Sequence, residues 1–391
     1  KMNDSINLVD NSLVFCITNS QSLTQNTNTM YLNCSNLFSY KSMNNDFGPY
    51  NLAQFHDFFE SFNIKYQHAK KLNQQLCCFC QSNPQIISNA LALICSFCVI
   101  YLNCSPAEIN LKVQSLSVQP APFKDISVGQ CPFYLHILDI MNCFLKAQQS
   151  QFFPSDFSSQ KYYQMLKPES GHISEIIKGK LFACPSPIDP NHVLFKSQPL
   201  PPNIFVEAFK ELNVTALIRL NDSYYQKNEF INNGIHHYDL NYPDGSVPND
   251  DIIQNFFKIL DSEKIVVIHC MAGLGRTGTL ICLELIRKYN FTAREAIAWT
   301  RICRQGSVSG QQQVFVCSIE DKVKSEDFNI KKRKFVFKKI DVSEVRQDTT
   351  PRKKPQSNQG NQQPQPDQTV TRGVVKKKPK NVLQKTHSLP P

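Results

Sequence analysis

Residues 264–290 read KIVVIHCMAGLGRTGTLICLELIRKYN. The β-branched apolar run Ile265–Ile268 predicts a short buried strand, and Thr277–Tyr289 carries apolar residues at helical spacing. Between them lies the glycine-punctuated loop His269–Arg276. The stretch therefore predicts a strand, a tight loop and a helix, a unit that can bind an anion in its loop.

The loop has the composition of a catalytic phosphate site. In Cys270-x5-Arg276 the backbone N–H groups between the thiol and the guanidinium have to converge on one point, and Gly273 and Gly275 permit the necessary backbone angles. A thiol held by these amides, by the start of the helix and by an arginine is expected to ionise readily and to act as a nucleophile. The planar guanidinium can bind two phosphate oxygens. We expect the phosphate to contact Met271, Ala272, Gly273, Leu274, Gly275 and Arg276.

A plainer interpretation of the loop is a buried cysteine on a turn, followed by a solvated arginine. Of the fifteen cysteines in the chain, only Cys270 has an arginine six residues later. His269 precedes it, and Thr277 follows the arginine with a hydroxyl that can hydrogen-bond the sulfur. The whole context favours the catalytic interpretation.

A cysteine-based phosphatase also needs a carboxyl group that protonates the leaving oxygen and then activates water. Upstream of the loop stands YDLNYPDGSVPND, in which Asp244 lies between Pro243 and Gly245. A turn at the carboxyl edge of a sheet suits a mobile acid, so we predict Asp244, with Asp239 and Asp250 as competitors. Any of Gln311, Gln312 and Gln313 can orient the attacking water, although a polar helix start explains them equally well.

Charge divides the chain into two parts. Residues 331–391 contain 16 Lys+Arg and 4 Asp+Glu, a net +12, which leaves 42−16 = 26 basic against 32−4 = 28 acidic residues, a net −2, for residues 1–330. Few aromatic residues occur among the Lys, Gln, Pro and Asn of the tail, so we predict a disordered basic tail over 329–391. Its lysine clusters can contact nuclear import factors, or serve only to keep the protein in solution.

No signal peptide opens the sequence, and the apolar stretch Ala90–Leu102 is too short to span a bilayer, so we expect a soluble protein without a membrane partner. Two cysteine pairs, Cys77-x2-Cys80 and Cys95-x2-Cys98, imitate a zinc ribbon. Because the first pair lies in the strand-like LCCFC and the second in an apolar helix, we expect buried thiols and no metal.

The order of predicted elements indicates an α/β protein. Strands at Leu13–Ile17 and Gln75–Cys80 and helices at Pro84–Leu102 and 131–146 make a first domain, 13–150, after a loose segment 1–12. A polar linker over 151–178 leads to a second domain, 179–328, which contains the phosphate loop. Strands that alternate with helices favour a mostly parallel sheet flanked by helices.

HCMAGLGRTGTL, YDLNYPDGSVP and TRICRQGSVSGQQQ together resemble the cell-division-cycle-fourteen (CDC fourteen) family of dual-specificity phosphatases. DFGPYNLA, FKDISVGQC and NVTALIRLN resemble that family's landmarks too, so the likeness runs from Leu13 to Ser325. The resemblance implies two tandem dual-specificity-phosphatase domains, of which only the second is catalytic, with the active site between them. It implies no cofactor.

The resemblance also implies residue roles. Cys270 is then the nucleophile, Arg276 the phosphate clamp, Asp244 the general acid and Gln312 the residue that positions water. Asp125 and Glu169 match carboxylates with which the family reads a basic residue of the substrate. Implied substrates are proteins phosphorylated on Ser or Thr before Pro, and phosphotyrosine, in mitotic exit, cytokinesis and related cell-cycle control. The implied location is the nucleus and cytoplasm, or the centrosome, basal body or spindle.

Several positions depart from the family pattern. Met271 replaces a lysine, Gln305 replaces a proline, and Leu166 occupies a position that is acidic in the family, which predicts a weaker preference for a distal basic residue. Two rival functions are a phosphoinositide phosphatase and a catalytically weak phosphoprotein-binding scaffold. Met271 and Leu274 lack the charge that extra inositol phosphates need, and the cysteine, arginine and aspartate of an active enzyme are all present. Nucleic-acid binding through the tail is at most accessory, because interleaved aromatic residues are sparse there.

Overall fold

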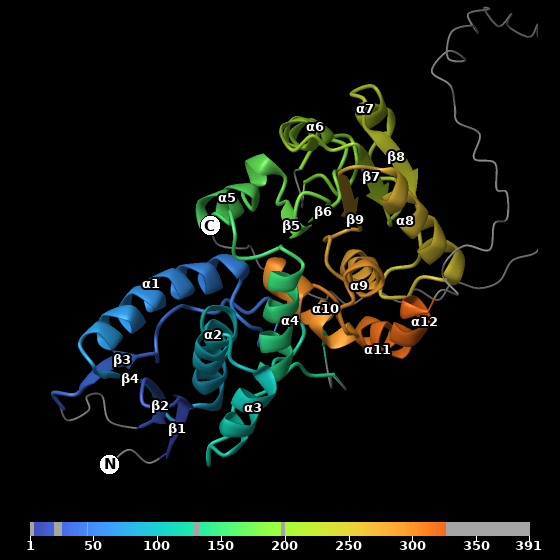
Figure 1. Ribbon diagram of the computed structural model, residues 1–391. Helices are drawn as coiled ribbons and strands as arrows, with labels where there is room; N and C mark the ends of the chain where they lie inside the picture. The colour runs from blue at the N-terminus through green and yellow to red at the C-terminus, as the bar shows by residue number, and fades with distance from the viewer. Residues whose placement is uncertain (1–3, 19–25, 45, 129–132, 197–199, 326–391) are drawn as a thin grey trace, which may run out of the picture. The chain divides into compact units, whose positions relative to one another are not determined.

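The computed structural model describes residues 4–18, 26–44, 46–128, 133–196 and 200–325 (Figure 1). The predicted tail, 329–391, lies entirely outside the described residues, as do the last three residues of the predicted second domain. The N-terminal half contains β1 (Asp4–Val9), β2 (Leu13–Ile17), β3 (Thr29–Asn33), α1 (Leu52–Lys71), β4 (Gln75–Cys80), α2 (Pro84–Leu102), α3 (Pro106–Gln114) and α4 (Ile137–Gln149).

The second half begins with α5 (Ser159–Met165) and the 3-10 helix η1 (Pro168–Ser170). It continues with β5 (Ser174–Ile177), β6 (Leu181–Cys184), α6 (Pro202–Glu211), β7 (Ala216–Arg219), α7 (Asn228–Ile231), β8 (His236–Asp239), α8 (Asp250–Ser262), β9 (Val266–His269), α9 (Gly275–Tyr289), α10 (Ala293–Cys303), α11 (Gln311–Ser318) and α12 (Glu320–Lys324).

Each half is built on its own sheet. The N-terminal sheet has the order β1-β2-β4-β3, in which β2 and β3 run parallel to β4 and β1 pairs antiparallel with β2. The second sheet has the order β5-β6-β9-β7-β8, and only β5 is antiparallel to its neighbour (Figure 1). Each sheet is mostly parallel, as predicted. Because β9 is central in the second sheet, the loop after it opens at the carboxyl edge of the sheet, where α/β folds bind ligands.

The two halves share one apolar core. Helix α4 of the N-terminal half packs against α10 of the second half, and Phe144 and Trp299 meet edge to face with ring centroids 6.0 Å apart. Arg294 of α10 donates to both carboxylate oxygens of Asp139 at 2.8 Å. The domains are therefore distinct in their sheets but continuous in their packing, which fixes loops of the N-terminal half beside the second sheet.

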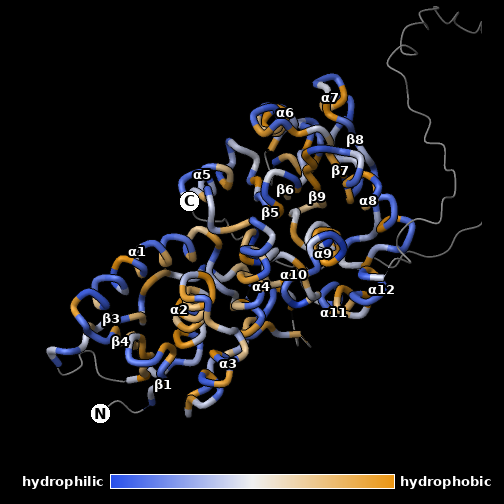
Figure 2. Tube along the Cα trace, viewed as in Figure 1, coloured by the Kyte–Doolittle hydropathy of each residue, from blue (hydrophilic) through white to orange (hydrophobic). Residues whose placement is uncertain are grey.

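Helix α2 lies deep in this core. It is long and apolar enough to cross a membrane, contrary to the expectation from Ala90–Leu102, but 78% of its most apolar window is buried inside the protein. Its trace in Figure 2 is hydrophobic along most of its length. Asn83 caps the first turn by accepting from the N–H groups of Gln85 and Ile86. Burial on all sides is what an evenly apolar helix requires in a protein core.

The predicted cysteine positions follow the same packing. LCCFC forms β4, and Cys77 and Cys80 are buried in that strand, while Cys95 and Cys98 are buried in α2. Within the described residues no group of three or more His, Cys, Asp or Glu side chains has the geometry of a metal site. Buried thiols on a strand and a helix account for the zinc-like spacing.

Three sequence-based boundaries are wrong. The segment 1–12 was expected to be loose, yet Asp4–Val9 forms β1, because Ile6 and Leu8 bury their side chains against the core. The linker 151–178 contains α5, η1 and β5, and β5 completes the catalytic sheet. The helix expected from residue 131 begins at Ile137, since Leu135 pairs in an isolated bridge with Phe123. Polar composition hid the elements in 1–12 and 151–178, whereas the apolar composition of 131–136 extended the predicted helix too far.

Candidate active site

The loop 270–274 leaves β9 and enters α9, and it forms the predicted strand-loop-helix unit. Gly273 has a φ of +68°, and a β-carbon built on it would lie 2.0 Å from the carbonyl oxygen of Cys184. No side chain fits there, so this glycine is required by both conformation and space. Cys270 is 3% exposed at the mouth of the loop.

Arg304 holds the outer side of the loop. Its Nε donates to the carbonyl of Gly273 at 2.8 Å and its Nη2 to the carbonyl of Ala272 at 3.0 Å. Its Nη1 donates to the carbonyl of His172 at 2.7 Å and to Ser174 Oγ at 3.1 Å. Burial lowers the pKa of Arg304, but an arginine keeps its charge in a protein. Because two loop carbonyls point to Arg304, the intervening amides are free to face a phosphate.

The sequence did not identify Arg304 as a functional residue, although it lies in the landmark stretch TRICRQG. The available signal was a charged residue within the landmark stretch TRICRQG. That signal does not say what the side chain contacts. The contact with the phosphate loop spans 31 residues of sequence and appears only in the folded chain.

A buried hydrogen-bonded chain supports the loop from the strand side. His269 Nδ1 donates to the carbonyl of Cys270 at 3.1 Å, so its Nε2 accepts from the hydroxyl of Tyr225 at 2.8 Å. His237 Nε2 in turn donates to the Tyr225 oxygen at 2.8 Å. Burial lowers the pKa of His269 to about 3 and that of His237 to about 4, so both rings are neutral near pH 7. The chain fixes the carbonyl of the nucleophilic residue without adding a charge next to the thiol.

Arg276 sits at the base of the site, with a side chain that is 5% exposed. Its Nη1 donates to the carbonyls of Leu220 at 3.2 Å and Tyr242 at 2.9 Å, while the Tyr242 hydroxyl donates back to the Arg276 carbonyl at 3.0 Å. Its Nε lies 3.1 Å from Oδ1 of Asp244, an ion-pair contact without the alignment of a hydrogen bond. The guanidinium is thus held on one side and faces the candidate acid on the other.

The structure separates Asp244 from its two competitors. Asp239 accepts from Arg219 Nε at 2.7 Å, and Asp250 is bound by Lys322 at the start of α8. Asp244 alone of the three contacts Arg276, and its side chain is 77% exposed, so it can approach a substrate oxygen. This arrangement supports the choice of Asp244 as the acid.

The three adjacent glutamines have different surroundings. Gln311 is exposed, whereas Gln313 is buried and its Oε1 accepts from Arg301 Nη2 at 2.7 Å. Gln312 is 2% exposed, its Nε2 donates to the carbonyl of Ser246 at 3.1 Å, and its Oε1 would lie 2.8 Å from a β-carbon on Gly275. Within the described part of the chain this Oε1 has no hydrogen-bond partner. Gln312 therefore offers an acceptor to a water at the phosphate loop, and it also contacts the loop of Asp244.

Thr277 follows Arg276 and is fully buried, and its Oγ1 has no hydrogen-bond partner among the described residues. A buried hydroxyl normally has a partner, so this one is available for the sulfur of Cys270, as the sequence suggested.

The two predicted groove carboxylates differ in exposure. Glu169 is exposed in η1, close to the half-buried Leu166. Asp125 is 2% exposed, and its carboxylate accepts from Gly310 N at 2.6 Å, from Gln313 Nε2 at 3.0 Å and from Ser127 Oγ at 2.8 Å. Protein donors thus already occupy the Asp125 carboxylate, and its role in recognising a basic residue of the substrate stays a prediction.

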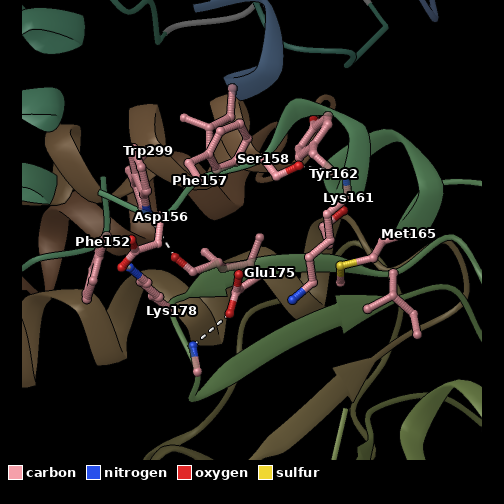
Figure 3. A pocket seen from close by; sticks show the side chains of 15 residues that line it. Phe152, Asp156, Phe157, Ser158, Lys161, Tyr162, Met165, Glu175, Lys178 and Trp299 are labelled. Carbon is pink, nitrogen blue, oxygen red and sulfur yellow. Dashed lines mark hydrogen bonds and ion pairs between the residues drawn. The ribbon is translucent and has the colours of Figure 1, made fainter. Parts of the chain in front are cut away.

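A separate cavity of about 350 Å³ lies between α5 and β5 (Figure 3). Trp299 and Tyr162 form part of its wall, and the charged ends of Lys161 and Glu175 point into it. Trp299 Nε1 donates to the carbonyl of Ile176 at 2.9 Å. Neither Cys270 nor Asp244 lines this cavity, so it is distinct from the phosphate loop.

The fold and the loop define the class as dual-specificity phosphatase. Residues 7–147 match the family described as dual specificity protein phosphatase, N-terminal half, and residues 196–290 match that described as polymorphic toxin system, DSP-PTPase phosphatase. The dual specificity protein phosphatase CDC14B of Mus musculus is 36% identical over 292 residues, which cover 74% of this chain and 60% of that protein. CDC14A of Homo sapiens is 38% identical over 303 residues, which cover 74% of this chain and 49% of that protein.

The chain belongs to the CDC14 family of dual-specificity protein phosphatases. It spans about half to three fifths of the length of these two relatives. The match includes the N-terminal half as well as the catalytic half, which agrees with two sheets joined by one core.

Proposed function

We propose that this protein is a cysteine-based protein phosphatase that hydrolyses phosphoserine, phosphothreonine and phosphotyrosine. The observation that carries the proposal is the contact between the acid and the clamp at the phosphate loop, Asp244 Oδ1 to Arg276 Nε at 3.1 Å, next to a buried cysteine. Family membership supports a role in cell-cycle control and a preference for phosphosites that precede proline.

In the first step the thiolate of Cys270 attacks phosphorus, an S–P bond forms and the P–O bond to the substrate side chain breaks. Asp244 gives its proton to the departing oxygen. The loop amides and Arg276 stabilise the charge on the non-bridging oxygens, since donors that are already in place need no reorganisation during the reaction. Thr277 can donate to the sulfur and make it a better leaving group later.

In the second step water attacks phosphorus, the S–P bond breaks and inorganic phosphate leaves. The Asp244 carboxylate takes one proton from the water, while Oε1 of Gln312 accepts a hydrogen bond from the other O–H, which stays on the phosphate that is formed. The Nε2 contact of Gln312 with Ser246 holds the amide in the orientation that presents Oε1 to the loop. The two steps use the same carboxyl group, first as an acid and then as a base.

The test is turnover of matched phosphopeptides: pSer-Pro with Lys three residues on, pSer-Ala with that Lys, and pSer-Pro without it, beside a soluble phosphoinositide. We expect the pSer-Pro peptides to be preferred. Indifference to Pro, or preference for the phosphoinositide, would overturn the substrate assignment. Cys270→Ser should abolish turnover of all of them while still binding phosphopeptide, and near-wild-type turnover by that variant would overturn the mechanism itself.

We also propose that the protein is located in the nucleus and cytoplasm, and that nuclear import factors bind its basic tail. Binding of import factors by the lysine clusters of 331–391 is supported by their charge alone. Loss of nuclear signal from a fluorescent fusion that lacks residues 329–391 would support it, and an unchanged distribution would overturn it.

A further inference from the structure

We propose that Asp125, a residue of the N-terminal half, is a positioning residue for the second chemical step: it holds Gln312 where that side chain orients water. The inference rests on the proposed function. It gives the N-terminal half a part in hydrolysis of the phosphocysteine, and it replaces the role that the sequence suggested for Asp125.

Asp125 is fixed from its own domain. Lys124 and Phe47 pair in an isolated bridge, with Phe47 N donating to the Lys124 carbonyl at 3.2 Å, and Phe123 pairs with Leu135 in another. Phe123 is fully buried. The segment that carries the carboxylate is therefore anchored on both of its preceding residues, so it can serve as a rigid support for a neighbouring element.

The carboxylate acts on the first turn of α11. Gly310 is the N-cap of this helix, with φ +56° and ψ −132°, and its N–H donates to Asp125 Oδ2 at 2.6 Å. Gln313 Nε2 donates to the same oxygen at 3.0 Å. Two points of the turn, three residues apart, are thus tied to one oxygen atom, which fixes both the start of the helix and its rotation about its axis.

This rotation decides where Gln312 points. Adjacent helical residues project about 100° apart, so holding Gln313 toward Asp125 turns Gln312 toward another side. That side is the phosphate loop, because Gln312 Oε1 lies 2.8 Å from where a β-carbon on Gly275 would be, and Gln312 Nε2 donates to the carbonyl of Ser246. Gln312 is the member of the pair that meets the reacting groups, and Gln313 and Asp125 act through it.

The support also includes a buried cation. Arg301 Nη2 donates to Gln313 Oε1 and, at 2.8 Å, to the carbonyl of Val308. Val308 has a φ of +58°, unusual for a β-branched residue, and its N–H donates to the carbonyl of Leu274 in the phosphate loop at 3.3 Å. Asp125 and Arg301 are buried charges of opposite sign, joined by Gln313. Asp125→Asn would remove the charge and weaken the hold on the turn while keeping the shape of the side chain.

The two roles of Asp125 make different predictions for Asp125→Asn. If it positions Gln312, phosphorylation of Cys270 stays fast and hydrolysis of the phosphoenzyme slows. The value of kcat then falls about tenfold even for p-nitrophenyl phosphate, which is less than the loss of about 10²-fold or more expected when the base itself is removed. If it reads a basic residue of the substrate, KM rises for the peptide with Lys and p-nitrophenyl phosphate is unaffected. Rapid denaturing quench of enzyme during turnover measures the phosphorylated fraction, which should rise only in the first case.

Asp139→Asn is the matched control, because Asp139 also joins the two halves, through Arg294, and the hydrogen bonds described for its carboxylate go to Arg294 and His136 and not to α11. Its kcat and phosphoenzyme fraction should equal those of the wild type. In a double-mutant cycle Asp125→Asn should add little to Gln312→Ala, since both changes remove the same contribution. Additive effects, or an unchanged phosphoenzyme fraction in Asp125→Asn, would overturn the proposal.

Folding is checked by the thermal unfolding midpoint and by vanadate binding. If Asp125→Asn does not fold, Gln313→Glu provides the second variant: it loses the donor to Asp125 and should raise the phosphoenzyme fraction, and no rise would overturn the proposal. If the wild type forms no phosphoenzyme and turns over no phosphomonoester, the proposed function fails. If the wild type is active and the variants have the same kcat and phosphoenzyme fraction as the wild type, the proposed function stands and the positioning role fails.

Discussion

Asp244 and Arg276 are joined by a contact of 3.1 Å between Oδ1 and Nε, although the first side chain is 77% exposed and the second only 5%. The buried guanidinium is fixed by backbone carbonyls, whereas the carboxylate sits on the exposed segment 243–247. An incoming phosphate would occupy the guanidinium that Asp244 now meets, so substrate binding would release the carboxylate for proton transfer.

Asp244→Asn should affect substrates according to their leaving groups. A serine oxygen leaves poorly without a proton, so we expect kcat/KM on a phosphoserine peptide to fall about 10²-fold or more. p-Nitrophenolate leaves readily and should lose far less. Steady-state rates on both substrates measure the difference. Asp239→Asn is the control: because Asp239 pairs with Arg219, this variant should leave the ratio of the two rates unchanged. An equal loss of kcat/KM on both substrates in Asp244→Asn would exclude Asp244 as the acid.

Arg304→Lys should loosen the phosphate loop while keeping the charge. A lysine cannot reproduce the fork that reaches Gly273, Ala272 and His172 together. With about two charge-assisted hydrogen bonds lost, we expect a stability loss of about 3 kcal/mol and weaker inhibition by vanadate. Denaturant unfolding and vanadate titration measure these. Arg287→Lys is the control, because Arg287 forms an ion pair with Asp261. Equal vanadate affinity in the two variants would count against the role of Arg304 in holding the phosphate loop.

Gly273→Ala should damage the loop more than its φ alone explains. Gly179 has a comparable φ of +63°, but a β-carbon there meets nothing within 4 Å, whereas at Gly273 it meets the Cys184 carbonyl at 2.0 Å. Gly179→Ala therefore measures the backbone cost, about 1 kcal/mol. We expect Gly273→Ala to lose activity and several times that stability. Similar unfolding free energies for the two variants would show that the loop can move away from the carbonyl.

Stability should fall on mild acidification because of two buried histidines. The pKa of His269 is lowered from 6.5 to about 3 and that of His237 from 6.5 to about 4. Below about pH 6.5 the unfolded chain binds protons that the folded chain does not, so stability is lost as the pH falls from about 6.5 toward 4. At about pH 5 each histidine should cost about 2 kcal/mol.

Urea unfolding between about pH 7.5 and 5 measures this loss. His237→Gln should reduce the slope, since one of the two buried rings is gone, and the exposed His68→Gln should not. A slope that is the same in His237→Gln and in the wild type would mean that His237 takes up its proton in the folded state.

Much of the catalytic loop followed from the sequence because it is local. The strand that ends at His269, the loop and α9 are continuous in the chain, so their apolar pattern and glycines predicted both the fold of this unit and its phosphate-binding residues. The sheet order, with β9 at the centre, was not predicted in detail. It depends on which strands pair across long stretches of sequence.

The acid and the glutamines were only partly determined by sequence. Asp239, Asp244 and Asp250 carry the same side chain, so their chemistry does not distinguish them in the sequence. The contact of Asp244 with Arg276 distinguishes it in the fold. Among the glutamines a shift of one residue turns a helical side chain by about 100°, from Asp125 to the phosphate loop.

Sequence by itself determined the chemistry of this protein: a cysteine and an arginine at a fixed spacing, with glycines that let the backbone enclose an anion. Only the tertiary structure decided which distant side chains support that chemistry. Arg304, His237 and Asp125 act through buried contacts with residues far along the chain. Such contacts arise when elements pack, and burial then makes each hydrogen bond costly to lose.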